Sequence, residues 1–136
     1  MKYTGSLDSN VLLRLIVGDL PDQAKVAEDL IANGKDFAVS DTAFIEVMFV
    51  LERHYQYSRS EIKKAIKYVM RHPKVHSKEQ IISETLELFS ANTALSPEDC
   101  YLAIKAKNYN ALPLWTFDKK LAKQSSGLAR LVDSLG

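Results

Sequence analysis

Four acidic residues stand at positions from which an α/β protein could bring their carboxylates together. These residues are Asp8 in SLDSNVLLRLI, Glu46 in SDTAFIEVMFVLE, Asp99 in SPEDCYLAI and Asp118 in LWTFDKK. Carboxylates held close together repel one another, so such a cluster costs stability unless a cation neutralises it. Mg²⁺ and Mn²⁺ are hard ions that prefer oxygen ligands. If the four acids converge, they would form a site for one of these ions.

The segments around these acids are typical of a parallel sheet covered by helices on both faces, because short apolar strands alternate with helical patterns. Strands are expected at residues 3–7, 37–39, 112–116 and 128–132, with a brief extended piece at 74–76. Helices are expected at residues 11–17, 22–31, 41–54, 79–90 and 97–107, with another between Ser58 and His72-Pro73 and a short one after Asp118. Helix caps are expected at Asp22, Ser40, Ser58, Ser96 and Asp118. The sequence thus predicts one α/β domain over residues 1–136.

The predicted topology would place all four acids at one edge of the sheet. Asp8 directly follows the first strand, and Asp118 follows the strand at 112–116. Glu46 and Asp99 fall in the opening turns of helices. Because sites in open parallel sheets form beyond the carboxyl ends of the strands, this edge is where a site is expected.

Three of the acids also have local structural explanations. Asp8 and Asp118 could simply cap the helices that follow them. Asp99 occupies the third position of a capping box that begins at Ser96-Pro97. Taken alone, Asp8 leaves both interpretations open, whereas Asp99 and Asp118 each favour the structural one. The joint occurrence of all four acids favours a functional site.

Glu46 is the acid that a structural role explains least well. It is the only polar side chain in AFIEVMFVL, so it is expected to lie in or beside the core. An unpaired carboxylate there is costly, so Glu46 would be protonated, bound to a cation or paired with a base. Arg14 is the candidate base for such a pair, and the metal interpretation is favoured over it.

The overall composition is that of an ordinary globular protein, with 46% hydrophobic and 26% charged residues. No apolar run approaches the roughly 20 residues that span a bilayer, and the N-terminus lacks the apolar stretch of a signal peptide. A cytoplasmic protein without membrane contact is therefore expected. The single cysteine, Cys100, excludes an intramolecular disulfide and a cysteine-rich zinc site, and is expected in the core.

Charge is distributed unevenly along the chain. Residues 59–78 contain seven Lys or Arg and one Asp or Glu, whereas residues 1–58 contain five and nine. The basic residues of 59–78 mostly occupy the polar side of an amphipathic helix, where a solvated face is the simpler explanation. Contact with nucleic acid is the alternative explanation. It is favoured by the acidic candidate metal site in the same chain, because a polyanion could bind through metal ions there.

With these residues in view, the chain resembles PIN-domain proteins, and specifically the VapC toxins of bacterial type II toxin–antitoxin pairs. The resemblance covers nearly the whole length in four ordered blocks. The blocks are LDSNVLLRLI, SDTAFIEVMFVLERHYQYSRSEI, EDCYLAIKAK and LWTFDKKLAK. Each block alone is weakly specific, and the four in this order at these spacings are much more so.

The resemblance implies a three-layer sandwich in which helices flank a central parallel sheet. It also implies Mg²⁺- or Mn²⁺-dependent endoribonuclease activity with one or two ions, inhibition by a cognate antitoxin protein, and frequent homodimerisation. The acids that would bind metal and carry catalysis are Asp8, Glu46, Asp99 and Asp118. Asn10 and Thr116 would be supporting polar groups, and Ser9 keeps the hydroxyl of the threonine that is commoner in the family.

Two other functions are compatible with parts of this pattern. A degenerate PIN fold could dock a partner without catalysis, although the retention of all four acids argues against decay. A phosphatase of the haloacid-dehalogenase type also begins with a strand followed by aspartate. That chemistry uses a second aspartate two residues later, where this chain has Asn10.

Overall fold

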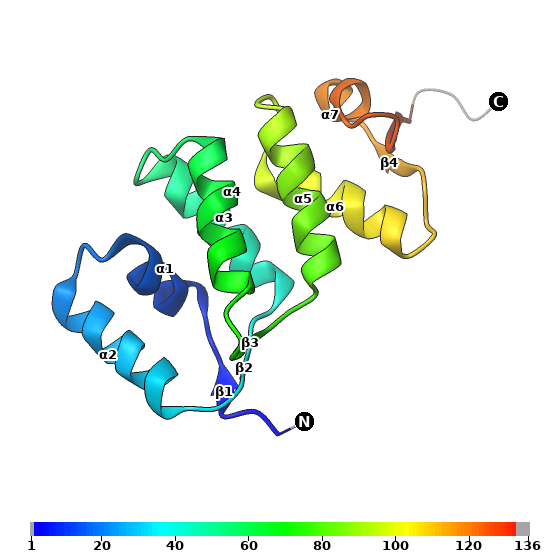
Figure 1. Cartoon of the computed structure of the whole chain (residues 1–136). Helices are drawn as coiled ribbons and strands as arrows, with labels where there is room; N and C mark the ends of the chain where they lie inside the picture. Colours follow the sequence, from blue (N-terminus) through cyan, green and yellow to red (C-terminus); the bar gives the residue numbers. More distant parts are fainter. Residues whose placement is uncertain (1, 133–136) are drawn as a thin grey trace. The chain divides into compact units, whose positions relative to one another are not determined.

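The computed structural model describes residues 2–132, which contain five short strands and seven helices (Figure 1). The chain divides into two compact units, residues 1–79 and 80–136. Each unit has its own parallel sheet. The predicted α/β class with parallel strands is therefore confirmed. The single domain expected over residues 1–136 stays a prediction.

The first unit contains a three-stranded sheet in the order β1-β2-β3, with all neighbours parallel. Its strands are β1 (Gly5–Ser6), β2 (Phe37–Ala38) and β3 (Val75–His76). Its helices are α1 (Ser9–Val17), α2 (Pro21–Asn33), α3 (Asp41–Arg53) and α4 (Arg59–Met70). Helix α1 contacts both α2 and α3, and α3 contacts α4, so the helices that connect the strands also pack on one another (Figure 1).

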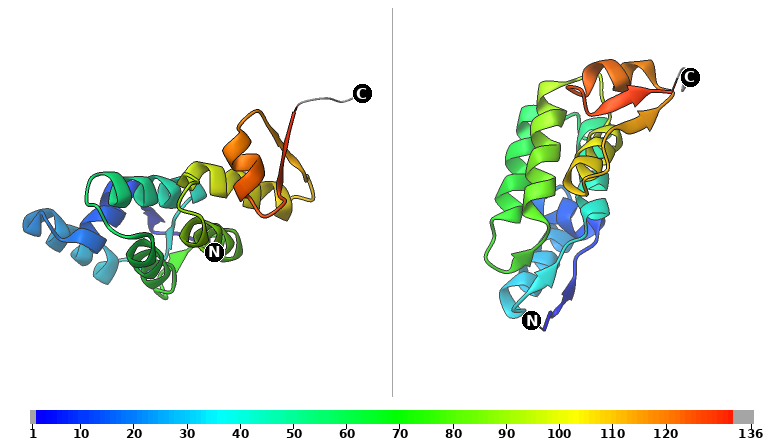
Figure 2. Two further views of the ribbon diagram at one scale, coloured as in Figure 1. Left: turned by 90° about the horizontal axis from the view of Figure 1, so that it is seen from above. Right: turned by 90° about the vertical axis from the view of Figure 1, so that its right-hand side faces the viewer.

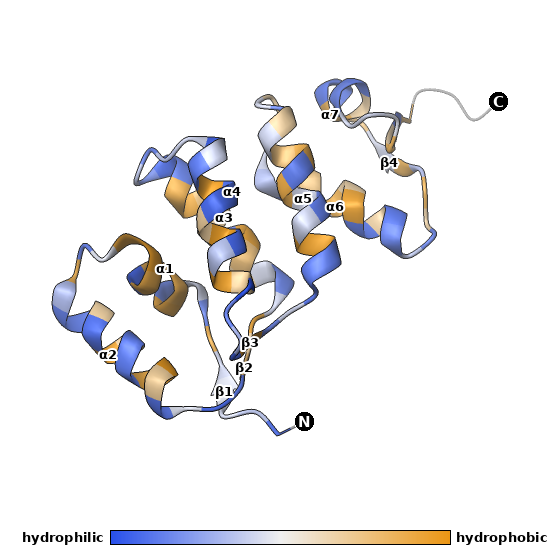
Figure 3. Cartoon of the chain, in the orientation of Figure 1, coloured by the Kyte–Doolittle hydropathy of each residue, from blue (hydrophilic) through white to orange (hydrophobic). Residues whose placement is uncertain are grey.

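Hydrophobic periodicity explains the packing of the first unit. Helix α1 is hydrophobic along most of its length, whereas α2 alternates hydrophobic and hydrophilic positions (Figure 3). On α4, the buried residues are spaced as one helical stripe. They are Ile62, Ile66, Val69 and Met70. Lys64 and Arg71 are exposed on this basic segment, as expected for a solvated face.

The second unit contains a two-stranded parallel sheet and three helices. The elements are α5 (Glu79–Ala91), which begins at the boundary between the units, α6 (Pro97–Asn108), β4 (Leu114–Thr116), α7 (Lys119–Gln124) and β5 (Ala129–Leu131). Strand β4 pairs with β5, and α7 lies against both strands (Figure 2). Cys100 is fully buried, which confirms its predicted place in the core.

Local capping signals are mostly confirmed. Ser40, Ser58 and Ser96 each accept a hydrogen bond from a backbone N–H in the first turn of their helices. The cap expected at Asp22 is wrong, because Leu20 precedes α2 and Pro21 takes its first position. None of the helices within residues 2–132 has the length and hydrophobicity that a membrane span requires.

Candidate active site

Asp8 is the N-cap of α1 and directly follows the first strand. Its Oδ1 atom accepts a hydrogen bond from the backbone N–H of Val11 at 3.0 Å, and the side chain is exposed. In the described part of the chain, Oδ2 has no hydrogen bond. The capping role that the sequence left open is therefore real, and it uses only one of the two carboxylate oxygens.

Asp118 has the same relationship to α7, with more hydrogen bonds. Its Oδ1 accepts from the backbone N–H groups of Lys120 at 2.9 Å and Leu121 at 3.1 Å. The N–H of Asp118 itself donates to Oγ1 of Thr116 at 2.9 Å. Asp118 is exposed, so its second oxygen remains available to a ligand.

Asp99 is half-buried in the first turn of α6. Its backbone N–H donates to Oγ of Ser96 at 3.1 Å, which is one half of a capping box. The reciprocal bond is not formed, and within residues 2–132 the carboxylate of Asp99 has no hydrogen bond or ion pair. The local explanation therefore accounts for the backbone at this position but leaves the carboxylate without a role.

Glu46 is exposed on α3, so the expectation that it lies in or beside the core is wrong. The buried stripe of α3 includes Phe44, Val47, Met48 and Leu51, which recur at intervals of three and four residues, and Ala43 and Ile45 are buried beside it. Glu46 lies off this stripe. The apolar Phe49 is itself 39% exposed, so apolar neighbours in the sequence do not ensure burial on this helix.

The alternative pairing of Glu46 with Arg14 is also wrong. Arg14 forms an ion pair with Asp19 at 3.2 Å and donates to the hydroxyl of Tyr55 at 3.2 Å. The Tyr55 hydroxyl in turn donates to Asp19 at 2.8 Å. These three residues form a closed network, which accounts for the Arg14 charge without Glu46.

The four acids are divided between the two units. Asp8 and Glu46 belong to the first unit, whereas Asp99 and Asp118 belong to the second. Among residues 2–132, no three His, Cys, Asp or Glu side chains form a group that could hold a metal ion. The convergence of all four acids therefore stays a prediction. Of the supporting residues in the first unit, Asn10 is exposed and Ser9 is buried.

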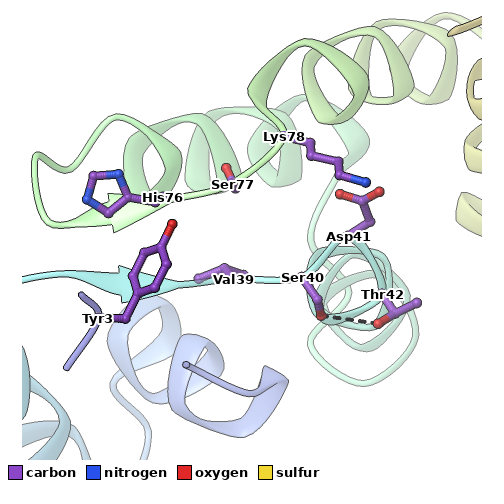
Figure 4. A pocket seen from close by; sticks show the side chains of 8 residues that line it. All are labelled: Tyr3, Val39, Ser40, Asp41, Thr42, His76, Ser77 and Lys78. Carbon is purple, nitrogen blue, oxygen red and sulfur yellow. Dashed lines mark hydrogen bonds between the residues drawn. The ribbon is translucent and has the colours of Figure 1, made fainter. Parts of the chain in front are cut away.

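A pocket of about 510 Å³ lies where β2 and β3 end and α3 begins (Figure 4). Its polar lining includes Ser40, Asp41, Thr42, His76, Ser77 and Lys78. Asp41 is only 9% exposed, and its carboxylate and the Lys78 ammonium group point toward one another (Figure 4). Oγ of Ser77 is buried without a hydrogen-bond partner in the described chain. This pocket occupies the sheet edge where the topology predicts a site.

Asp41 is a polar residue of this pocket that was not among the four acids singled out from the sequence. The available signal was its place directly after a strand and a capping serine, which is similar to the place of Asp8 after the first strand.

His76, which ends β3 and lines the pocket, has two further contacts. Its Nε2 atom contacts Oδ1 of Asp36 at 2.7 Å. The ring of Tyr3 meets the His76 imidazole edge-on, with centroids 5.8 Å apart.

The sequence matches the model of one protein family over most of its length. Residues 6–126 match the PIN domain, and this range includes all four acids. The α/β fold with parallel strands agrees with that match. A search of curated proteins gives no match to the chain. The chain therefore belongs to the PIN-domain family, whose members are in general metal-dependent nucleases.

Proposed function

We propose that this chain is a divalent-metal-dependent endoribonuclease whose catalytic and metal-binding residues are Asp8, Glu46, Asp99 and Asp118. One observation carries the proposal: within residues 2–132, none of these four carboxylates forms an ion pair with a protein cation. Other acids do form such pairs, among them Asp19, Asp29, Glu52 and Glu84. The four acids thus keep the negative charge that attracts a divalent cation.

The chemistry of this donor set suits Mg²⁺ or Mn²⁺, because all four residues offer carboxylate oxygens. Asp8 and Asp118 each fix Oδ1 on backbone N–H groups, which restricts the orientation of Oδ2. One or two ions held by the four acids would supply a water molecule of lowered pKa and neutralise charge on the scissile phosphate. Asp8 and Glu46 belong to the first unit, and Asp99 and Asp118 belong to the second.

The remaining residues have distinct roles in this scheme. Thr116 positions Asp118 by accepting a hydrogen bond from its backbone N–H. Asn10 is exposed and could donate its amide to a phosphate oxygen, whereas the buried Ser9 could act only by orienting its neighbours. Glu46 is exposed and could accept the proton of the attacking water wherever it is not itself a metal ligand.

The test compares the purified protein with its Asp8→Asn variant on RNA that contains single-stranded loops, with Mg²⁺ or Mn²⁺ and with EDTA. Asparagine caps helices as well as aspartate does, so this variant removes the charge and keeps the fold. We expect metal-dependent cleavage by the wild type and at least about 100-fold less by Asp8→Asn. Glu98→Gln is the matched control, because Glu98 is an exposed acid beside Asp99. Equal cleavage by wild type and Asp8→Asn would remove the metal-site proposal.

The membership of single acids in the ligand set has a separate test. Asp8→Asn and Asp99→Asn should each alone weaken Mn²⁺ binding in calorimetry. A variant that binds Mn²⁺ as tightly as the wild type would remove its acid from the proposed ligand set. RNA binding without cleavage by the wild type, together with no Mn²⁺ binding, would favour the alternative of a non-catalytic binding module.

We further propose that the protein acts in the cytoplasm as the toxin of a toxin–antitoxin pair, that it forms homodimers, and that a cognate antitoxin protein inhibits it. The four sequence blocks that resemble such toxins support this role. A short neighbouring reading frame that encodes a DNA-binding protein is expected. Co-expression of that protein should relieve growth arrest caused by this chain, and arrest that persists despite complex formation would contradict the role.

A further inference from the structure

The strand β4 presents two large aromatic side chains to solvent. Trp115 is 49% exposed, and Phe117, which directly follows the strand, is 79% exposed. Leu114 and Thr116, which alternate with them, are half-buried. Because side chains on a strand point alternately to opposite faces, Trp115 lies on the outer face of the β4–β5 sheet, and the exposed Phe117 follows just beyond the strand end.

Trp115 and Phe117 are two residues apart in the sequence, a separation compatible with one flat ring between their side chains. Positions two apart on a strand are separated by about 6.6 Å. Stacked bases lie about 3.4 Å apart, so two rings with one base stacked between them must be about twice that distance apart. This distance is close to the separation of positions two apart on a strand. An unpaired nucleobase could therefore stack between Trp115 and Phe117, whereas a base inside a duplex is already stacked on both faces.

The chain segment that carries this aromatic pair has mostly positive charges. Arg130 lies opposite Trp115 in the strand register, and its guanidinium carbon is 5.7 Å from the centroid of the Trp115 ring system. Residues 112–132 carry four cations, Lys119, Lys120, Lys123 and Arg130, against the single acid Asp118. None of these cations forms an ion pair within the part of the chain that the structure describes.

We propose that Trp115, Phe117, Arg130, Lys119 and Lys120 form a docking site for single-stranded RNA, in which one unpaired base stacks on the aromatic rings. Aromatic platforms combined with Arg and Lys are the common means of holding unpaired nucleotides, and such stacking tolerates any base. The inference deepens the proposed function, because the phosphate next to the stacked base would lie beside Asp118. It also explains why cleavage would be confined to unpaired segments.

Aromatic residues and Arg are also frequent in protein interfaces, so a second copy of the chain is the rival occupant of this face. The excess of unpaired positive charge favours the polyanion, because two such faces brought together would repel each other. The two occupants make different predictions in solution.

Trp115 is the only tryptophan of the chain, so its fluorescence reports on this site alone. The protein is titrated with a short single-stranded RNA. EDTA is present throughout, so that metal-dependent cleavage does not occur during the measurement. We expect saturable quenching of the Trp115 emission. An oligonucleotide of the same length with abasic sugars should quench far less, and so should a blunt RNA duplex.

Substitutions identify the residues involved. Phe117→Ala should weaken binding by roughly 10-fold or more, and Phe117→Tyr should restore it. Lys119→Ala combined with Lys120→Ala should reduce the salt dependence of binding and leave the amplitude of quenching unchanged. Tyr68→Ala is the matched control, because Tyr68 is an 81% exposed aromatic on the basic helix α4 of the first unit.

Several results would overturn the proposal. RNA binding detected by anisotropy without any change in Trp115 emission would place the RNA elsewhere. Loss of binding in Tyr68→Ala with full binding in Phe117→Ala would place it on α4. Emission that changes with protein concentration before RNA is added, and then no longer responds to RNA, would show that a second copy covers this face.

Failure of this inference can be told apart from failure of the nuclease proposal. Quenching by RNA with no cleavage in Mn²⁺ would leave the docking site standing and remove the enzymatic activity. Cleavage at the wild-type rate by Phe117→Ala, with no quenching in the wild type, would remove the docking site and leave the enzymatic activity standing.

Discussion

The backbone N–H of Asp118 donates a hydrogen bond to the hydroxyl of Thr116, with 2.9 Å between nitrogen and oxygen. The Asp118 carboxylate also accepts hydrogen bonds from the backbone N–H groups of Lys120 and Leu121. These contacts fix both the main chain and the side chain of Asp118 at the end of β4. A proposed metal ligand is thus positioned by a residue that need not touch the metal.

Thr116→Val should therefore impair the proposed metal site through Asp118. Valine has the shape of threonine but cannot accept the hydrogen bond, whereas Thr116→Ser can. We expect Thr116→Val to lower Mn²⁺ affinity about 10-fold and to lower stability by about 1 kcal/mol. Calorimetric titration and denaturant unfolding measure the two effects. If valine and serine variants bind Mn²⁺ equally well, Thr116 has no positioning role.

Glu46→Gln should leave stability unchanged to within about 0.5 kcal/mol, because the side chain is exposed and has no ion pair in the described structure. Cleavage of RNA should nevertheless fall strongly if Glu46 is a ligand or base. Glu52 lies on the same helix and is the comparison, because its carboxylate accepts from Nε of Arg59 at 2.7 Å. Glu52→Gln should destabilise the fold by about 1 kcal/mol and leave Mn²⁺ binding intact.

Tyr55→Phe should destabilise the first unit, because it removes the hydroxyl that joins Arg14 to Asp19. Two hydrogen bonds to charged groups are lost, and Arg14 is only 13% exposed in its side chain. A loss of about 1–3 kcal/mol in the free energy of unfolding is expected. Tyr57→Phe is the control, since the neighbouring Tyr57 lies outside this network. Equal stability of the two variants would show that the network contributes nothing.

Stability should fall in acid partly because of Glu84. The Asn108 amide, which donates to Glu84 at 2.9 Å, lowers the pKa of this carboxyl below its ordinary value of 4.5, with smaller help from Gln80 and Lys107. A group whose pKa is lowered in the folded state stabilises the fold above the unfolded value. That contribution is lost as the pH falls below about 4.5 and through the lower folded value.

Glu84→Gln removes this titration, so the stability gap between wild type and variant should narrow as the pH falls from about 6 to about 3. The stability difference between the wild type and Asn108→Ala should narrow over the same pH range, because this substitution raises the pKa of Glu84 toward the ordinary value. Denaturant unfolding at several pH values measures both. A gap that stays constant across this range would show that the Asn108 contact does not favour the charged carboxylate.

Helix starts could be predicted from sequence because they depend on neighbouring residues. The side chains of Ser58 and Glu61 form a complete capping box, in which each accepts the backbone N–H of the other. Those hydrogen bonds hold the pKa of Glu61 below its ordinary value. Pro113 shortened the predicted strand at 112–116, because it has no N–H to donate, and β4 begins at Leu114.

The environment of Glu46 could not be predicted in the same way. Eight apolar residues surround it in AFIEVMFVL, yet only one stripe of a helix can face the core, and which residues share that stripe depends on the rest of the fold. The burial of Asp41 could not be predicted either, because it depends on residues at the end of β3, 35 or so positions later in the chain. Capping depends on three or four residues, whereas burial depends on the whole chain.

The double duty of Asp8 has a consequence for how this fold can change in evolution. The carboxylate that would bind metal also starts α1, so most substitutions there damage the fold and the chemistry together. Asparagine caps a helix as well as aspartate does, and it is reached from aspartate by a single-base change in the codon. A lineage that loses catalysis at this position while keeping a folded protein is therefore expected to carry asparagine there more often than alanine or valine. The helix start thus leaves one easy mutational route from an enzyme to an inactive scaffold.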